Sequence, residues 1–301
     1  MFSRKNKLLL LKFVSLFSVV RGYNILIITL AQYLSSIYIL APNKPLGQVV
    51  FDLNLFMLVT ATALAIAGGY IINNFYDAEK DLINRPKKSM LDRLVSQRTK
   101  LTTYFVLNFG SIFFASYVSF RAVVFFAFYI FGIWWYSHRL KKIPFLGNLI
   151  SALLAITPFF AVFIYYKNFE TVIFVHATFL FLVIAMRELV KDLENLKGDL
   201  AQNYKTIPVL FGERMSKGLI TFLVVLTLVP IFLLAKYFDL GLMHYYFYAS
   251  VILLLVFLLL LFRAGSRNHY LLLHNILKFV IVSGVFSILL LDIDLVLSRI
   301  L

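Results

Sequence analysis

The stretch Asn73–Asp81, NNFYDAEKD, follows directly on a long apolar run and decides how the rest of the chain is interpreted. It places Asn73, Asp77 and Asp81 at spacings of four, so on a helix their side chains lie on one face. Polar groups aligned at the end of a membrane-length segment are costly unless a cation, a partner or water meets them. We therefore treat the three residues as a candidate functional site, the alternative being a solvated helix end with chance polar residues.

The composition of the whole chain is that of an integral membrane protein. Of its 301 residues, 61% are hydrophobic and 14% are charged, whereas an ordinary soluble domain has about 25% charged residues. The apolar runs reach the length of a membrane helix and lack the alternation of barrel strands, which predicts an all-α polytopic membrane protein. The chain contains no cysteine, which excludes disulfides, thiolate metal sites and cysteine nucleophiles.

The net charge of +15 allows two interpretations with different partners. Nucleic-acid-binding proteins carry basic residues on soluble faces with stacking aromatic side chains nearby. Here most of the 32 Phe and 17 Tyr lie inside apolar runs, so we expect no nucleic acid. The charge is better explained as a topology signal and as attraction to anionic membrane lipid or to an anionic substrate.

We expect one integral-membrane domain, residues 1–301, with nine spanning helices. Residues 1–22 are predicted to form a basic interfacial lead-in, and residues 76–100 and 190–217 are predicted to form long polar, catalytic loops. The expected spans are near 23–41, 51–75, 101–120, 123–136, 149–165, 171–189, 219–236, 245–262 and 272–297.

The Lys and Arg residues predict the orientation of these spans. With the N-terminus inside, only five of the 29 basic residues fall on the outer side: Lys44, Arg121, Lys167, Lys236 and Arg299. Such a bias places both polar loops on the cytoplasmic face of a bacterial or archaeal cell membrane. Asp292 and Asp294 then lie at the outer end of the last span, away from both loops, and we interpret them as interfacial.

Acidic residues are concentrated in and beside the two loops, which hold nine of the 14. Glu188, Asp192 and Asp199 recur at spacings of four and seven and can share a face. Two such oxygen-rich faces brought together suit a hard divalent cation. Mg²⁺ is favoured over Ca²⁺ because the chain has no compact loop with six or more oxygen ligands, and Mg²⁺ is commonly held by carboxylates together with substrate phosphate.

Basic residues are interleaved with these acids and suit phosphate recognition. They are Arg85, Lys87, Lys88, Lys141, Lys142, Lys191 and Lys205. Cleavage of an allylic diphosphate needs metal and cationic groups to stabilise the leaving diphosphate, and the carbocation must be shielded from water. The two loops therefore predict a site for Mg²⁺ and the diphosphate of a lipid substrate.

The motifs resemble those of the UbiA-type intramembrane prenyltransferases. The stretch Asn73–Asp81 matches the first aspartate-rich motif of that family, and Asn84-Arg85-Pro86 matches the Asn-Arg-Pro after it. Residues 136–142, YSHRLKK, with Gly147-Asn148 look like the family's basic connector. RELVKDLENLKGD, residues 187–199, followed by Lys-Thr-Ile-Pro at 205–208, is similar to the second motif, although Asn195 and Leu196 stand where some members have an acid.

The resemblance implies a bundle around a central cavity and Mg²⁺-dependent transfer of a prenyl chain from a polyprenyl diphosphate to a lipophilic acceptor. The metal ligands carried over are Asn73, Asp77, Asp81, Glu188, Asp192 and Asp199, and Lys141 is carried over with Asp77, Asp81, Asp192 and Asp199 as catalytic. The implied substrate-binding residues are Arg21, Asn24, Arg85, Lys142, Lys191 and Lys205.

Several alternatives remain open at this level. The second motif resembles the branch that alkylates geranylgeranylglyceryl phosphate, but related members prenylate aromatic acceptors such as 4-hydroxybenzoate or quinone precursors. A cation-coupled secondary transporter would instead place its charges near the bilayer midplane in broken helices. A family member without activity could act as a scaffold. The oligomeric state is not predicted.

Overall fold

The structure, a computed structural model, describes residues 4–292. Nine helices in this part of the chain are long and apolar enough to cross a membrane, which confirms the predicted number and the all-α class. They are α2 with the π-helical segment η1 (Gly22–Leu40), α4 (Leu53–Tyr76), α7 (Gln97–Val118), α8 with η2 (Phe120–Lys142), α9 (Leu146–Tyr166), α10 (Thr171–Glu194), α12 (Ile207–Tyr237), η3 with α13 (Gly241–Arg263) and α14 with η4 (Arg267–Leu290).

Short helices connect these spans or precede them. They are α1 (Arg4–Val20), α3 (Leu46–Val50), α5 (Ala78–Asn84), α6 (Pro86–Asp92) and α11 (Leu196–Ala201). Side-chain caps begin several of the spans. Asp52 accepts hydrogen bonds from the backbone N–H groups of Asn54 and Leu55 at the start of α4, and Ser96 accepts one from Thr99 in α7. These acceptors satisfy N–H groups that have no partner within the helix.

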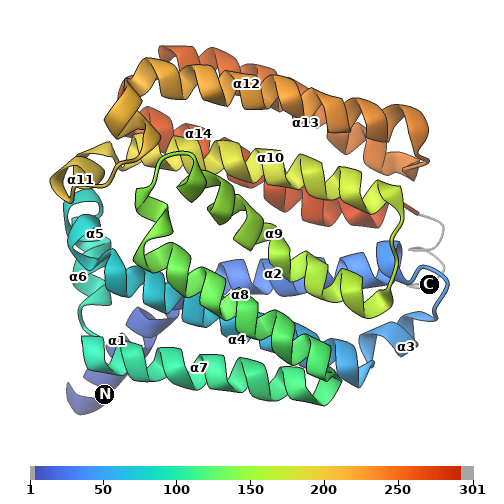
Figure 1. The fold of residues 1–301 in the computed structure, drawn as a ribbon, viewed down its shortest axis with the longest axis horizontal. Helices are drawn as coiled ribbons and strands as arrows, with labels where there is room; N and C mark the ends of the chain where they lie inside the picture. The colour runs from blue at the N-terminus through green and yellow to red at the C-terminus, as the bar shows by residue number, and fades with distance from the viewer. Residues whose placement is uncertain (1–3, 293–301) are drawn as a thin grey trace.

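The bundle has two halves, each built around one long helix that carries a motif (Figure 1). In the N-terminal half, α4 packs against α7 and α8, and its apolar core is formed with η1 and α9. In the C-terminal half, α10 packs against α12 and α14, and that core also includes α13. Because α4 and α10 are the most deeply buried spans, the polar residues at their ends are held by rigid surroundings.

The loop boundaries differ from those expected. The predicted loop 190–217 is largely helical, since α10 continues to Glu194 and α12 begins at Ile207, which leaves α11 and a short turn between them. Residues 76–100 likewise contain α5, α6 and the start of α7. The charged residues of these two segments predict loops, so the expected helices are shorter than the observed ones. In the structure those charges are paired with one another, so the helices continue through them.

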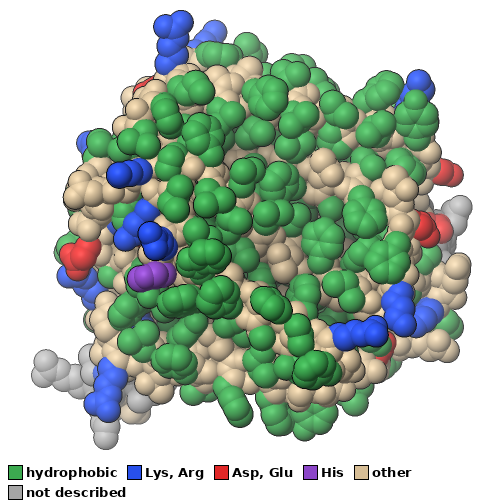
Figure 2. Space-filling view, in the orientation of Figure 1, with side chains coloured by type: hydrophobic (Ala, Val, Ile, Leu, Met, Phe, Trp, Pro, Cys, Tyr) green, Lys and Arg blue, Asp and Glu red, His purple; other side chains and the backbone are tan. Residues whose placement is uncertain are grey.

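The surface agrees with a membrane location. Figure 2 shows hydrophobic side chains across the middle of one face, with Lys and Arg side chains gathered towards its two ends. The predicted lead-in, residues 1–22, contains the helix α1 and the first residue of α2, and the two helices are separated by Arg21. Asp294 and the predicted end of the last span lie outside the described residues.

Candidate active site

The two motifs meet at one end of the bundle, where α5 contacts α11 (Figure 1). Asn84 joins them: its Oδ1 accepts from the backbone N–H of Gly198 at 3.0 Å, and its Nδ2 donates to the carbonyl of Asn195 at 3.2 Å. A Cβ on residue 198 would lie 2.3 Å from the Asn84 amide, so only glycine allows this approach. The Asn-Arg-Pro sequence thus places the first motif against the second.

Asp77 lies at the break between α4 and α5, with φ −92° and ψ 4°. Its Oδ1 is 2.7 Å from the Lys141 ammonium, which also donates to Asn73 Oδ1 at 3.3 Å. The Tyr204 hydroxyl donates to the same Asp77 oxygen at 3.1 Å. Burial by itself raises the pKa of Asp77, but Lys141 and Lys80 outweigh it and hold that pKa at about 2. Asp77 is therefore a carboxylate throughout the physiological range.

Lys80 links the two motifs. Its ammonium lies 3.1 Å from Asp199 Oδ1 and 3.8 Å from Asp77 Oδ1, and it lies 4.6 Å from the centre of the Tyr204 ring. Burial lowers the pKa of Lys80, but Asp77 and Asp199 outweigh it and raise that pKa above its ordinary value. One cation therefore already occupies the space between a carboxylate of each motif.

The second motif is arranged along the last turns of α10. Glu188 is buried and forms ion pairs with Lys191 at 2.9 Å and Arg187 at 3.1 Å.

The two aspartates of the second motif have different partners. Asp192 Oδ2 accepts from Asn148 Nδ2 of the basic connector at 2.8 Å. Asp199, in α11, accepts weakly from Thr206 at 3.4 Å in addition to its pair with Lys80. Glu188 has two cationic partners already, whereas the Asp192 carboxylate has no cation within ion-pair distance among the described residues.

Most of these side chains line a polar pocket, defined by Asn73, Asp77, Asp81, Lys141 and Asp192 with their neighbours. Asp199, a predicted metal ligand, is fully buried and is not part of this lining. No group of three Asp, Glu or His side chains in residues 4–292 is gathered closely enough to hold a metal ion. The donor set nevertheless fits a hard divalent cation, because it consists of carboxylate and amide oxygens. The ammonium of Lys80 between Asp77 and Asp199 shows that this position accommodates positive charge.

The predicted phosphate-binding residues fall into two groups. Lys141 and Lys191 line the polar pocket, as does Arg85, whose guanidinium also pairs with the buried Glu194 at 3.1 Å. Lys142 and Lys205 are exposed and are absent from the lining; the Lys142 ammonium lies over the Tyr204 ring at 5.0 Å. Substrate contact by Lys142 and Lys205 remains a prediction.

Next to the polar pocket lies a central cavity between the two halves, lined by residues of α2, α4, α8, α9, α10 and α14. The two spaces share five lining residues: Arg21, Asn73, Tyr136, Glu188 and Lys191. Asn24 also lines the central cavity and donates to the hydroxyl of Tyr70 at 3.0 Å. The sequence prediction that Arg21 and Asn24 face substrate is therefore compatible with their positions.

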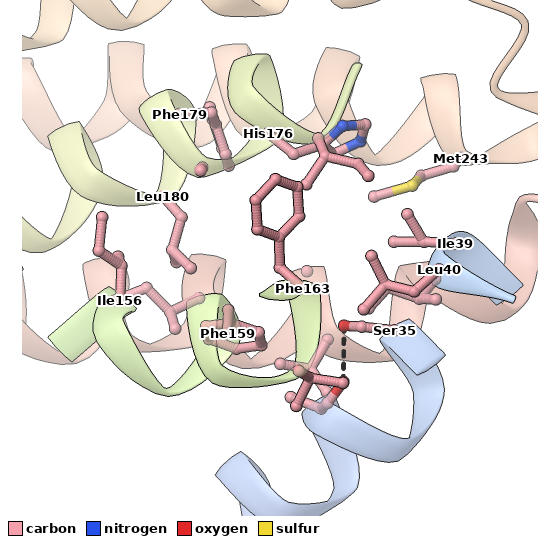
Figure 3. A pocket seen from close by; sticks show the side chains of 18 of the residues that line it. Ser35, Ile39, Leu40, Ile156, Phe159, Phe163, His176, Phe179, Leu180 and Met243 are labelled. Atoms are coloured by element: carbon pink, nitrogen blue, oxygen red, sulfur yellow. Dashed lines mark hydrogen bonds between the residues drawn. The ribbon is translucent and has the colours of Figure 1, made fainter. Parts of the chain in front are cut away.

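Beyond the central cavity lies an apolar distal cavity, shown in Figure 3. Phe159 and Leu180 line both spaces, so the two cavities are adjacent. The labelled side chains include Ile39, Phe163, Phe179 and Met243, so the walls offer almost only apolar contact. From the polar pocket through the central cavity to the distal cavity, the lining changes from charged to apolar. This order suits a molecule with an anionic head and a long hydrocarbon tail.

Two residues that we expect to take no part in the chemistry are exposed in the structure. Glu79, within the first motif, is exposed and pairs with Arg93 at 3.3 Å. His138 is exposed and stacks on Trp134. The acids of both motifs lie at the ends of α4 and α10 and in α5 and α11, away from mid-span, which is not the arrangement expected of the transporter alternative.

Three residues of the site were not anticipated. Lys80 lies inside the first motif, three residues after Asp77, where an ion pair is possible on a helix. Tyr204 carries no sequence signal, because its role depends on the turn after α11. Lys278 lines the central cavity from within α14, and a lone lysine inside a membrane span is a functional candidate that sequence alone could have identified.

The chain resembles known proteins in sequence and in structure. The model of the UbiA prenyltransferase family matches residues 29–271. A digeranylgeranylglyceryl phosphate synthase of Thermococcus gammatolerans is 32% identical over 200 residues, covering 66% of this chain and 71% of that protein. A second such synthase, from Pyrococcus furiosus, is 33% identical over 174 residues, covering 56% of this chain and 61% of that protein.

Solved structures show the same fold. A UbiA homologue from Archaeoglobus fulgidus bound to GPP and Mg²⁺ has a TM-score of 0.67 at 14% identity, covering 91% of this chain and 99% of its own. A structure of digeranylgeranylglyceryl phosphate synthase in membranes has a TM-score of 0.70 at 19% identity, covering 96% of this chain and 99% of its own. The A. fulgidus homologue has also been solved with Cd²⁺.

Proposed function

The chain belongs to the UbiA prenyltransferase family, and from that premise we propose that it transfers a geranylgeranyl chain from geranylgeranyl diphosphate to geranylgeranylglyceryl phosphate. The observation that carries the proposal is the series of three adjacent spaces, polar pocket, central cavity and distal cavity, in which neighbouring spaces share lining residues. Its polar end holds acids of both motifs, and its far end is apolar. The relatives' names support the choice of acceptor.

In this assignment the diphosphate lies in the polar pocket. The Lys141 and Lys191 ammonium groups and the Arg85 guanidinium line it and can contact phosphate oxygens. Asn73, Asp77 and Asp81 would hold one Mg²⁺, and Asp192 with Asp199 would hold another. Bound Mg²⁺ neutralises the diphosphate and so favours its departure. Glu188 is the weakest candidate ligand, because Lys191 and Arg187 already occupy its oxygens.

The prenyl chain extends through the central cavity towards the distal cavity. Tyr70, Tyr129 and Tyr136 line the central cavity near its polar end, and their ring faces can stabilise an allylic cation while the apolar walls exclude water. The allylic C–O bond of the donor breaks, a C–O ether bond to the acceptor hydroxyl forms, and the departing diphosphate takes up the hydroxyl proton. Tyr136 lines both the polar pocket and the central cavity, which supports a role for its ring beside the breaking bond.

The test is product formation by purified protein from radiolabelled geranylgeranyl diphosphate. Geranylgeranylglyceryl phosphate, 4-hydroxybenzoate and buffer alone are supplied in parallel, with and without Mg²⁺. We expect a Mg²⁺-dependent product with the glycerol lipid only. Product with 4-hydroxybenzoate instead would reassign the acceptor. Transfer that survives Asp77→Ala and Asp192→Ala at the wild-type rate would overturn the assignment of the site.

The polar pocket is proposed to face the cytoplasm, on the strength of the Lys and Arg distribution. Because the chain has no cysteine, single cysteines can report sidedness without background. Gln202→Cys lies beside the site and Asn43→Cys at the opposite end, both at exposed positions. In intact cells an impermeant thiol reagent should label residue 43 and spare residue 202, and the reverse pattern would invert the topology.

A further inference from the structure

Positive charge on one wall of the central cavity has no acid to balance it. Lys278 of α14 lines this cavity, and its ammonium lies 4.4 Å from the centre of the Tyr23 ring in α2. Arg21 lines it as well, with its guanidinium 5.1 Å from the Tyr70 ring. Within residues 4–292 neither side chain has a carboxylate at ion-pair distance. Aromatic faces hold the two cations in place but do not neutralise them.

The conformation of Arg21 also indicates a function. This residue has φ 51° and ψ 53°, the left-handed region that a side chain other than glycine or asparagine rarely adopts. It separates α1 from α2 and directs its side chain towards the cavity. Left-handed residues of this kind are strained and are over-represented at ligand-binding positions.

The remaining charged side chains of the central cavity add to the surplus of positive charge. On the opposite wall, Arg187 and Lys191 share a single acid, Glu188. Arg187 is further oriented by His274, whose Nε2 lies 3.1 Å from the Arg187 guanidinium. The lining of the central cavity therefore has four basic side chains, Arg21, Arg187, Lys191 and Lys278, and one acidic side chain, Glu188. In the polar pocket the two kinds are nearly balanced, with five basic and four acidic side chains.

We propose that Arg21 and Lys278 form a second anion site, next to the diphosphate position, which binds the phosphomonoester head of the acceptor lipid. This inference rests on the proposed function and specifies it. A phosphomonoester carries a charge of roughly −1.5 to −2 at pH 7, which two unpaired cations match. Arg21 lines both the central cavity and the polar pocket, so a headgroup held there would present its adjacent hydroxyl to the allylic carbon.

The position of the site fits a lipid that enters from the bilayer. Lys278 and Tyr23 belong to helices that contact each other, α14 and α2. Tyr23 is 53% exposed, so the outer side of this contact faces the surroundings of the bundle. Phosphate bound between α2 and α14 would keep the acceptor's own chain clear of the distal cavity, which is assigned to the donor.

The experiment measures equilibrium binding to wild type, Lys278→Gln and Lys278→Arg, each in detergent and without prenyl diphosphate. The ligands are geranylgeranylglyceryl phosphate, geranylgeranylglycerol without phosphate, and phosphatidic acid. Lys236→Gln is the matched control, since the Lys236 ammonium also lies over aromatic rings, of Phe232 and Tyr237, but at the other end of the bundle. Thermal unfolding of each variant verifies its fold.

We expect Lys278→Gln to weaken binding of the phosphorylated lipid about 10-fold, the scale of one charge-assisted hydrogen bond. Lys278→Arg should stay within about 3-fold of wild type, and binding of the unphosphorylated lipid should not change. An unchanged affinity in Lys278→Gln, or an equal loss in Lys236→Gln, overturns the site. Equal binding of phosphatidic acid, lost equally in Lys278→Gln, would identify a site for membrane phospholipid and overturn the acceptor assignment.

The outcome is distinguishable from failure of the proposed function. If the enzyme transfers its prenyl chain to another acceptor, the phosphate-dependent binding and its loss in Lys278→Gln would still be measured. If transfer to geranylgeranylglyceryl phosphate occurs but Lys278→Gln binds it normally, the function stands and the site is wrong.

Discussion

Removal of the Lys80 charge tests the link between the two motifs most directly. The Asp199 side chain is 1% exposed, and its only cationic partner among the described residues is Lys80, at 3.1 Å. Lys80→Met would leave this buried carboxylate unpaired, whereas Asp77 would keep its 2.7 Å pair with Lys141. Breaking one side of a buried ion pair costs about 3–5 kcal/mol. At roughly 2 °C per kcal/mol for a chain of this size, metal-free Lys80→Met should unfold about 6–10 °C below wild type.

Mg²⁺ should offset that loss, because it would occupy the same carboxylates. We expect a larger rise in unfolding temperature on addition of Mg²⁺ with geranylgeranyl diphosphate for Lys80→Met than for wild type. The measurement is thermal unfolding in detergent with and without both ligands, and Lys80→Arg is the control that retains the charge. If Lys80→Met unfolds at the wild-type temperature and responds equally to Mg²⁺, Lys80 does not occupy the metal position and the reasoning fails.

Three further predictions concern the same site. Asp77→Asn should reduce prenyl transfer by about 10²-fold or more, because it removes a charge that faces the leaving group, while Glu79→Gln should stay within about 3-fold; similar losses in steady-state assays would contradict the geometry. The lowered pKa of Asp77, about 2, means that its contribution of about 2 kcal/mol is present above pH 4 and lost as pH falls from 4 towards 2; acid unfolding of wild type and Asp77→Asn should therefore converge over that window. Ala177→Phe places a ring in the distal cavity and should shift donor preference from geranylgeranyl towards shorter diphosphates, measured as the ratio of kcat/KM values; an unchanged ratio would place the chain elsewhere.

Much of the fold could be predicted from sequence because length and apolar composition determine membrane spans almost directly. The spacing of Asn73, Asp77 and Asp81 indicated the polar pocket, and all three line it. The predicted helix ends differ from those at Glu194 and Ile207, because charged residues after an apolar run usually indicate that the chain has left the membrane. In the structure, Glu194 is buried against Arg85 and Arg267, a pairing between distant segments that no local pattern reveals.

The role of individual cations was also beyond sequence. Lys80, Lys142 and Lys205 carry the same charge near the same motifs, yet only Lys80 is largely buried between two carboxylates. Which lysine meets which acid depends on the bend at Asp77 and on the contact of α5 with α11. Local propensity does not fix either of these, because both arise from packing between the two halves.

The separation of the bundle into two apolar cores has a consequence for biogenesis. Asp77 pairs with Lys141 inside the N-terminal half, and Glu188 pairs with Lys191 inside the C-terminal half. Each half can therefore leave the translocon with these acids already neutralised by neighbours of the same half. The pairs Lys80–Asp199 and Arg85–Glu194, and the Asn84–Gly198 contact, form only when the halves come together. The proposed catalytic site therefore requires contacts between the halves, and we expect it to be incomplete in a newly inserted chain until the two halves have joined.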